Sequence, residues 1–243
     1  MISVCMATYN GERYIREQVE SILSQLHSED EVIISDDNST DNTLNIIRSI
    51  NDSRVKILSH QPIKSNRRYS NSHYIVTSNF ENAIKYSSGD YIFLADQDDV
   101  WLPGKVDACL QALYECTLVV TNMQIIDKEG NVVAEKHFPK SPIKSFIQSL
   151  LSPPFYGCCM AFKKELAEFA LPFPKNLIMH DAWLGDLALL IGKVCYIDQP
   201  YIQYRRHNNN VSPKHSKNPL FFKLWYRLVL SFQIIRRFIM KNK

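Results

Sequence analysis

Hydrophobic and polar positions alternate along this chain between strand-like and helix-like segments, starting at the first residue. Short apolar runs predict strands at 2–7, 31–35, 55–58 and 90–95. Apolar residues that recur every three or four positions predict helices at 13–25, at a segment capped by Ser39 or Thr40, at 79–86 and at 103–114. Strands and helices that alternate in this way predict an α/β fold, with a mostly parallel sheet flanked by helices.

The alternation of strands and helices becomes less regular after residue 116. The segment Asp127-Lys128-Glu129-Gly130 predicts a hairpin turn between strands at 117–126 and 131–133. An apolar run at 156–162, a helix at 182–190 and strands near 194–197 and 201–204 follow, whereas the polar stretch 60–72 predicts a long loop. We predict one α/β domain over residues 1–216.

Composition adds limits to this picture. The chain has 243 residues, 45% of them hydrophobic and 22% charged, which is typical of a folded globular protein. No apolar stretch approaches the roughly 20 residues of a spanning helix, and no basic region precedes the first apolar run. The sequence therefore predicts a cytoplasmic protein without a signal peptide.

Charge is distributed unevenly. Residues 217–243 carry seven basic side chains and no acidic one, which leaves 21 basic and 25 acidic residues in the body. Plotted as a helix, this tail places Lys223, Arg227, Arg237 and Lys241 within one arc and apolar residues over much of the rest. It could lie in the headgroup region of an anionic membrane, or pack on the domain with its basic face in water. The acidic body argues against nucleic acid as a partner.

Six cysteines stand at positions 5, 109, 116, 158, 159 and 195, and no two form a C-x-x-C pair. This spacing does not fit a zinc ribbon or a thioredoxin-like motif. We expect all six to be reduced and to act as small buried hydrophobic residues.

Three polar clusters follow predicted strands, at 7–12, 36–41 and 96–99. Parallel sheets bind ligands beyond the carboxyl ends of their strands, so these clusters are expected to share one edge. Aspartate and asparagine are also common in turns and caps, so one cluster alone would indicate little. Three of them together predict a binding site.

The cluster Asp96-Gln97-Asp98-Asp99 carries the most specific signal. Its three carboxylates repel one another unless a cation compensates them. Mg²⁺ or Mn²⁺ bound by one or two carboxylates and by phosphate oxygens would do so. Trp101 stands where an EF-hand loop needs glycine, and the sequence contains neither a P-loop nor a G-x-G-x-x-G motif. The sequence therefore predicts that a metal ion held by these carboxylates binds the phosphates of the ligand.

These motifs resemble those of family 2 glycosyltransferases with the glycosyltransferase A fold. The similar segments are 3–11, 35–41, 89–101 and 204–212, and the resemblance covers residues 1–212. The form Asp-Gln-Asp-Asp-Val-Trp is similar to that of bacterial enzymes of capsular or O-antigen polysaccharide synthesis. The resemblance implies inverting transfer of a sugar from a nucleotide diphosphate sugar to a saccharide acceptor. It also implies a lipid-linked acceptor at the inner face of the cell membrane.

The resemblance also implies residue roles at the donor. Thr8, Tyr9 and Glu12 would line the base and ribose, Asp37 would hydrogen-bond the base, and Asp96 would face the ribose. Where relatives often have glycine, this chain has Asn38.

The diphosphate would be bound by a second group of residues. Asp98 would ligate the metal, with His207 as a further ligand, and Arg205 and Arg206 would meet the remaining phosphate charge. Lys105 could contact phosphates or belong to a solvated helix face.

Asp181 occupies the general-base position implied by the resemblance. Many relatives have Glu-Asp there, whereas this chain has His180-Asp181, and His180 could equally be an ordinary surface histidine. Trp183 is expected to touch the acceptor.

Two other functions stay open at this stage. A nucleotide- or glycan-binding protein without turnover could use the same cleft. A nucleotidyltransferase would share the metal chemistry, but it would carry a glycine-rich basic loop after the first strand. The donor could be a UDP or dTDP sugar, transferred as a hexosyl or rhamnosyl group.

Overall fold

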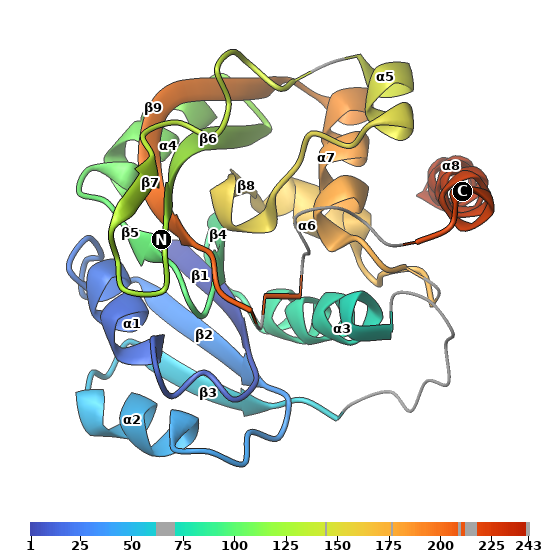
Figure 1. The fold of residues 1–243 in the computed structure, drawn as a ribbon. Helices are drawn as coiled ribbons and strands as arrows, with labels where there is room; N and C mark the ends of the chain where they lie inside the picture. Colours follow the sequence, from blue (N-terminus) through green and yellow to red (C-terminus); the bar gives the residue numbers. More distant parts are fainter. Residues whose placement is uncertain (62–70, 144, 176, 209, 212–217, 242–243) are drawn as a thin grey trace.

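The computed structural model describes residues 1–61, 71–143, 145–175, 177–208, 210–211 and 218–241. In this part of the chain one nine-stranded sheet is flanked by helices (Figure 1). Its strands are β1 (Ile2–Thr8), β2 (Glu31–Asp36), β3 (Val55–Ser59), β4 (Tyr91–Asp96), β5 (Val100–Trp101), β6 (Leu118–Ile126), β7 (Val132–Ala134), β8 (Met160–Lys163) and β9 (Val194–Arg205). The α/β fold with a mostly parallel sheet is confirmed.

The first half of the sheet is parallel, as predicted, and its strands stand in the order β3-β2-β1-β4. Its helices are α1 (Ile15–Leu23), α2 (Thr43–Ile50), α3 (Asn71–Lys85) and α4 (Lys105–Leu113). In the strand register Thr8 pairs with Asp36, and Ala7 pairs with Asp96. The three polar clusters therefore begin at one edge of the sheet, as predicted.

The second half is mixed. Strand β8 runs antiparallel to β4 and β6, β6 and β9 are parallel, and β5 pairs antiparallel with β9. The two strands predicted near 194–197 and 201–204 form one strand, β9, with register shifts where Asn122 faces Pro200. The predicted hairpin between β6 and β7 is present. The apolar run 156–162 divides into a 3-10 turn, Gly157–Cys159, and β8.

Several helix predictions need correction. Helix α2 begins at Thr43, and neither Ser39 nor Thr40 caps it. Helix α3 begins at Asn71 rather than at residue 79, while 62–70 of the predicted loop lie outside the described residues. Helices α5 (Phe146–Leu151) and α6 (Lys164–Ala170) are too short to show a period in the sequence.

The expectation of six reduced cysteines is wrong for one pair. Cys116 and Cys195 form a disulfide, with their Cα atoms 6.1 Å apart. Cys116 precedes β6, and Cys195 lies in β9, which pairs with β6 from Leu118 and Val194 onward. The two cysteines are 79 positions apart in the sequence, so no local spacing rule could reveal this contact. The other four cysteines are free and buried, as predicted.

The C-terminal helix α8 (Leu220–Lys241) lies beside α7 (His180–Ile191) (Figure 1). Tyr226, Leu230 and Ile234 are buried against the domain, and the boundary predicted at 216/217 falls outside the described residues. Arg237 is also on this face, where its guanidinium donates to the carbonyls of Leu171 and Pro172. The alternative in which α8 packs on the domain is therefore correct as to the packing, but one residue of its basic arc, Arg237, is buried rather than in water. None of the described helices combines the length and apolarity needed to cross a bilayer.

Candidate active site

The acidic loop after β4 meets the end of β9. Asp98 Oδ2 lies 2.7 Å from His207 Nε2, and Asn210 Nδ2 donates to the same oxygen over 3.1 Å. Both Asp98 and His207 retain 15% exposure of their side chains. The His207 ring stacks on Tyr14, with ring centroids 5.3 Å apart. A carboxylate and an imidazole from distant segments are thus held together at a surface that solvent can reach.

This pair has the geometry of two ligands of one divalent cation. Ligand atoms about 2.1 Å from Mg²⁺ and at right angles to each other are about 3 Å apart, close to the Asp98–His207 separation. A carboxylate oxygen and an imidazole nitrogen also form a suitable donor set for Mn²⁺. Asp98 and His207 could therefore hold a metal, with other positions available to water or phosphate.

The neighbouring carboxyls are less suited to a cation. Burial and the charges of Asp98 and Asp181 raise the pKa of Asp96 to about 7. Burial and the nearby Asp98 and Asp96 also raise the pKa of Asp99 well above its usual range. Asp99 Oδ1 accepts the Arg205 backbone N–H over 3.0 Å, while its Oδ2 is buried without a hydrogen-bond partner. The protonated form of Asp99 suits this environment.

A second trio, Asp96, Asp99 and Cys158, places its potential ligand atoms within 4.8 Å of one another. Contact with Cys159 and burial raise the pKa of the Cys158 thiol well above its ordinary value. Because thiols bind metals as thiolates, this trio favours a cation less than the Asp98–His207 pair.

Lys105 lies beneath this loop, so neither position considered for it is correct. It is fully buried, its Nζ donates to the Cys158 carbonyl over 2.8 Å, and its ammonium lies 4.4 Å from the centre of the Trp101 ring. Burial lowers its pKa. Lys105 supports the acidic loop from inside the protein and cannot reach a ligand at the surface.

Asp37, after β2, belongs to a hydrogen-bonded chain that reaches α3. Its Oδ1 lies 2.7 Å from His60 Nδ1, and His60 Nε2 lies 3.1 Å from Ser78 Oγ. The Ser78 hydroxyl donates to the Ile75 carbonyl, so its oxygen is left to accept the hydrogen bond from His60 Nε2. His60 therefore orients Asp37, whose Oδ2 has no donor among the described residues.

The loop after β1 positions the other predicted donor residues. Thr8 is buried, and its hydroxyl donates to Asp36 Oδ1 over 2.9 Å, so it supports the edge of the sheet from within. The Tyr9 side chain is 56% exposed, and its backbone is bracketed by both amide atoms of Gln97. Glu12 is exposed and accepts the Asn42 N–H over 2.9 Å, which ties this loop to the loop before α2.

The backbone conformation at Asn38 explains why asparagine can stand where related sequences often have glycine. Its φ of 59° lies in the left-handed region, where glycine is favoured and asparagine is tolerated better than most residues. The preceding Asp36 is buried and accepts both the backbone N–H and the hydroxyl of Ser39. The turn that presents Asp37 is thus preserved without glycine.

The structure separates the two predicted arginines. Arg205 is 3% exposed, donates to the Asp98 carbonyl and to Glu17, and lies over the Tyr14 ring. It stiffens the acidic loop at 96–99, and its position corrects the expectation that it contacts phosphates. Arg206 is partly exposed, with its guanidinium 4.8 Å from the centre of the Tyr204 ring, and it remains the candidate for an anion.

Asp181 is the second residue of α7. It is partly exposed, its Oδ1 accepts the Ala182 N–H, and burial raises its pKa to about 6. The effect of its charge on Asp96 shows that the two carboxyls lie within electrostatic range. A carboxyl with a pKa near neutrality can accept a proton at physiological pH.

The neighbours of Asp181 differ from expectation. The His180 ring stacks on Phe80 at 4.2 Å, and burial together with the charge of His73 lowers its pKa to about 3. It is therefore a neutral, packed imidazole and not a surface histidine. Trp183 is fully buried and donates to the Ala170 carbonyl, so it cannot touch an acceptor.

Sequence reasoning missed His60, Ser78 and Gln97. His60 directly follows β3, and Gln97 lies inside the acidic cluster, so both stand at the edge that the strand ends define. Their position after a strand could have identified both residues as candidates. Ser78 lies within a helix, and no sequence pattern predicts its contact with His60.

Comparison with known proteins gives a consistent result. The model described as glycosyl transferase family 2 matches residues 3–169. The dTDP-rhamnosyl transferase RfbG of Shigella flexneri is 31% identical, over 91% of this chain and 81% of its own length. The UDP-Glc:alpha-D-GlcNAc-diphosphoundecaprenol beta-1,3-glucosyltransferase WfgD of Escherichia coli is 28% identical, over 71% of this chain and 64% of its own.

Solved structures share the fold. S. aureus TarS in complex with UDP-GlcNAc superposes with a TM-score of 0.67 at 20% identity, over 94% of this chain and 66% of that one. The mannosyltransferase PcManGT from Pyrobaculum calidifontis, in complex with GDP-Man and Mn²⁺, gives 0.58 at 19% identity, over 97% of this chain and 64% of that one. The chain thus spans about two thirds of these neighbours.

Proposed function

Because the chain belongs to glycosyl transferase family 2, we propose that it is an inverting, metal-dependent enzyme of bacterial surface polysaccharide synthesis. It would transfer a sugar from a nucleotide diphosphate sugar to a lipid-linked saccharide at the inner face of the cell membrane. The observation that carries this proposal is the 2.7 Å contact between Asp98 and His207, beside Asp96, whose pKa is raised by burial and by the charges of Asp98 and the base candidate Asp181.

The nucleotide would lie across the edge of the parallel half-sheet. Uracil and thymine present the same N3–H donor, and Asp37 Oδ2 would accept it while His60 holds Oδ1. Tyr9 offers an exposed ring beside the base, and Thr8 and Glu12 fix the loop that carries it. Asp96 would face the ribose. Both UDP and dTDP donors fit this reading, so hexosyl and rhamnosyl transfer both remain candidates.

The metal and Arg206 would meet the diphosphate. Asp98 and His207 would hold Mg²⁺ or Mn²⁺, which when bound acts as a Lewis acid for the leaving diphosphate. Arg206 would add a guanidinium, the side chain best suited to phosphate oxygens. Arg205 contributes indirectly, because it fixes the Asp98 carbonyl and thereby the loop.

Asp181 would activate the acceptor. Its carboxylate takes the proton of an acceptor hydroxyl while that oxygen forms a bond to the anomeric carbon. The bond from the anomeric carbon to the nucleoside diphosphate breaks on the opposite face, which inverts the configuration. His180 is neutral and packed, so it would shape this part of the site without supplying a second acid.

One experiment separates this proposal from a binding protein without turnover. Purified protein is incubated with UDP and dTDP sugars in Mn²⁺ or in EDTA, and released nucleoside diphosphate is measured. We expect slow hydrolysis of at least one donor in Mn²⁺ and none in EDTA. Stabilisation by nucleotide sugar without release from any donor would favour the binding protein instead.

We expect replacement of His60 by phenylalanine to raise the KM for the donor about tenfold, with a smaller change in kcat. A hydrogen bond to a charged group contributes about 1.5–3 kcal/mol, and its loss would leave Asp37 unoriented. Ser78→Ala removes only the outer partner and should have a smaller effect. Steady-state kinetics measure both, and an unchanged donor KM in His60→Phe would contradict the role given to His60.

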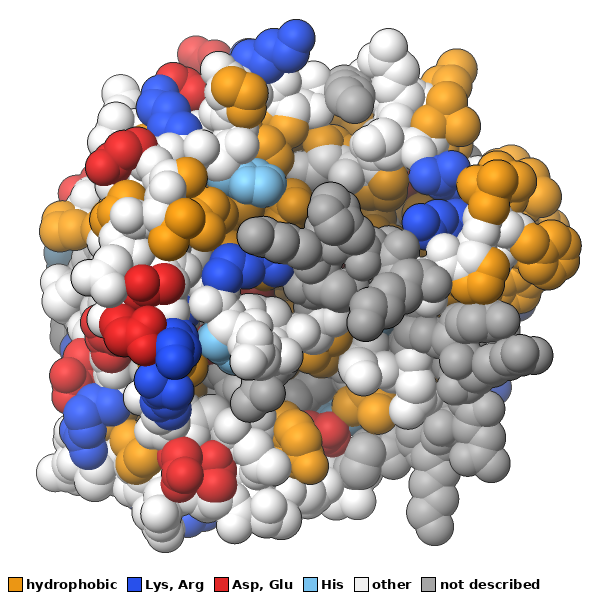
Figure 2. Space-filling view, in the orientation of Figure 1, with side chains coloured by type: hydrophobic (Ala, Val, Ile, Leu, Met, Phe, Trp, Pro, Cys, Tyr) orange, Lys and Arg blue, Asp and Glu red, His pale blue; other side chains and the backbone are white. Residues whose placement is uncertain are grey.

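The outward face of α8 supports association with an anionic membrane. Apolar side chains recur on it every three or four residues and are exposed: Phe221, Trp225, Leu228, Phe232, Ile235 and Ile239. Figure 2 shows this apolar surface gathered over α8 at the right. Residues 217–243 contain no acidic side chain, so two copies meeting along this face would repel, whereas anionic lipid would attract it.

We predict that the protein sediments with vesicles of phosphatidylethanolamine and phosphatidylglycerol, and far less with phosphatidylcholine alone. Leu228→Glu combined with Phe232→Glu should abolish this binding, because it places two carboxylates in the apolar face. Val133→Glu, at an equally exposed valine on β7, is the matched control. Equal sedimentation of all three proteins would remove α8 from this role.

A further inference from the structure

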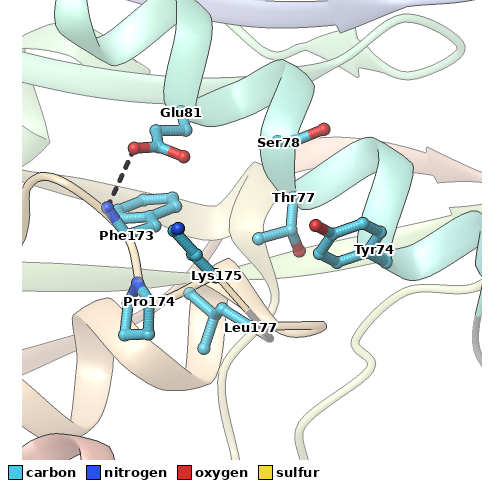
Figure 3. A pocket seen from close by; sticks show the side chains of 8 residues that line it. All are labelled: Tyr74, Thr77, Ser78, Glu81, Phe173, Pro174, Lys175 and Leu177. Atoms are coloured by element: carbon cyan, nitrogen blue, oxygen red, sulfur yellow. Dashed lines mark hydrogen bonds between the residues drawn. The ribbon is translucent and has the colours of Figure 1, made fainter. Parts of the chain in front are cut away.

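A pocket of about 370 Å³ opens between α3 and the segment that precedes α7 (Figure 3). Its walls are largely apolar, with Tyr74 on α3 and Phe173, Pro174 and Leu177 opposite. Thr77 contributes a hydroxyl group. This volume lies at the lower end of the range of small-molecule sites. Of the residues that we assign to the donor, the metal or the base, Ser78, the outer partner of His60, is the one among the described residues that also lines this pocket.

Lys175 gives the pocket its cation. Figure 3 shows its ammonium directed into the pocket toward α3, on the side of Glu81. The Glu81 carboxylate already accepts the Phe173 N–H over 2.9 Å and lies 3.3 Å from Lys85 Nζ. Lys175 has no ion-pair partner among the described residues. Its charge is therefore available to an anion, and Lys85 offsets the nearby carboxylate.

The pocket is connected both to the base and to the helix that would meet the membrane. Its lining residue Thr77 has Oγ1 3.5 Å from Nδ1 of His180, the residue before Asp181. Next to the lining residue Leu177, the Ile178 N–H donates to the hydroxyl of Tyr226 on α8 over 3.3 Å. The described residues of the stretch 173–181 thus carry a pocket wall, a contact to α8 and the base.

We propose that this pocket binds the diphosphate and the first isoprene units of a polyprenyl diphosphate-linked acceptor. This inference rests on the proposed function and adds the position of the lipid carrier. A saccharide hydroxyl at Asp181 and a prenyl chain at the membrane require the diphosphate to lie between them. The pocket offers an ammonium and a hydroxyl to phosphate oxygens, with apolar walls for the chain.

Farnesyl diphosphate tests the proposal by calorimetry with the full chain in EDTA, which removes cation-dependent binding at the donor site. We expect it to bind more tightly than farnesol and inorganic diphosphate, because only it offers both chemistries. Lys175→Glu should weaken binding at least about tenfold, because it reverses the charge of the one cationic side chain that lines the pocket among the described residues. Lys193→Glu, at an exposed lysine beside Glu115, is the matched control and should bind as wild type does.

Three results would overturn the inference. Lys175→Glu could bind as tightly as wild type, farnesol could bind as tightly as its diphosphate, or Asp98→Asn could abolish binding and so assign the ligand to the donor site. Donor hydrolysis in Mn²⁺ distinguishes the proposed function from the proposed pocket, because the Lys175→Glu variant should still hydrolyse the donor. Hydrolysis that is absent in wild type counts against the proposed function, whereas farnesyl diphosphate binding alone decides the pocket.

Discussion

Replacement of Asp181 by asparagine is expected to lower kcat about 10²–10⁴-fold, the range that a positioned general base contributes. The amide is nearly isosteric and can still accept the Ala182 N–H, so the start of α7 should stay intact. Nucleotide binding should survive, because Asp37, Asp98 and His207 are untouched. Kinetics of transfer and thermal shift with nucleoside diphosphate and Mn²⁺ measure the two quantities separately.

The pH profile offers a second readout of Asp181. Burial raises its pKa to about 6, and only the deprotonated form can accept a proton. Activity should therefore rise as the pH increases through about 6 and level off above it, and Asp181→Asn should lose this inflection. Asp186→Asn, at a buried carboxyl of the same helix, is the control for removing an acidic group from α7. If the Asp181→Asn variant turned over substrate as fast as wild type, Asp181 would not be the general base.

Local patterns predicted the parallel half of the sheet because β1, β2 and β4 are largely buried apolar runs followed by polar residues. Strand β2, for example, is buried over its whole length from Glu31 to Asp36. The mixed half was harder to predict because its strands pair across long separations. Neither the single strand β9 nor the disulfide between Cys116 and Cys195 follows from neighbouring residues, since both depend on how β6 and β9 align.

For the site, the strand-end rule located the acidic loop and Asp37 but could not tell which side chains face a ligand. Arg205 and Arg206 are adjacent, yet Arg205, the last residue of β9, is buried, whereas Arg206, just beyond the strand, is partly exposed. Lys105 shows the same limit, because helical position alone did not reveal a fully buried ammonium. His60 was missed because its function depends on Asp37 and Ser78, which other elements bring to it.

Asp98→Asn is expected to reduce kcat/KM about 10³-fold, since Lewis-acid stabilisation of a leaving diphosphate contributes several kcal/mol. The variant keeps the shape of the side chain and can retain its contact with His207, but it loses the charge that a divalent cation requires. Asp90→Asn, at the opposite end of β4, removes an exposed carboxylate with the same charge and is the matched control.

Manganese binding gives this prediction a readout that is independent of turnover. The electron paramagnetic resonance signal of free Mn²⁺ decreases as the ion binds, so titration with nucleoside diphosphate present measures affinity directly. Asp98→Asn should weaken binding at least about tenfold, because a neutral amide oxygen replaces the charged ligand, and Asp90→Asn should not. Equal Mn²⁺ affinity in wild type and Asp98→Asn would show that the Asp98–His207 pair is an internal salt link. The assignment of the metal to this loop would then fall, while the role of Asp181 would still be decided by its own variant.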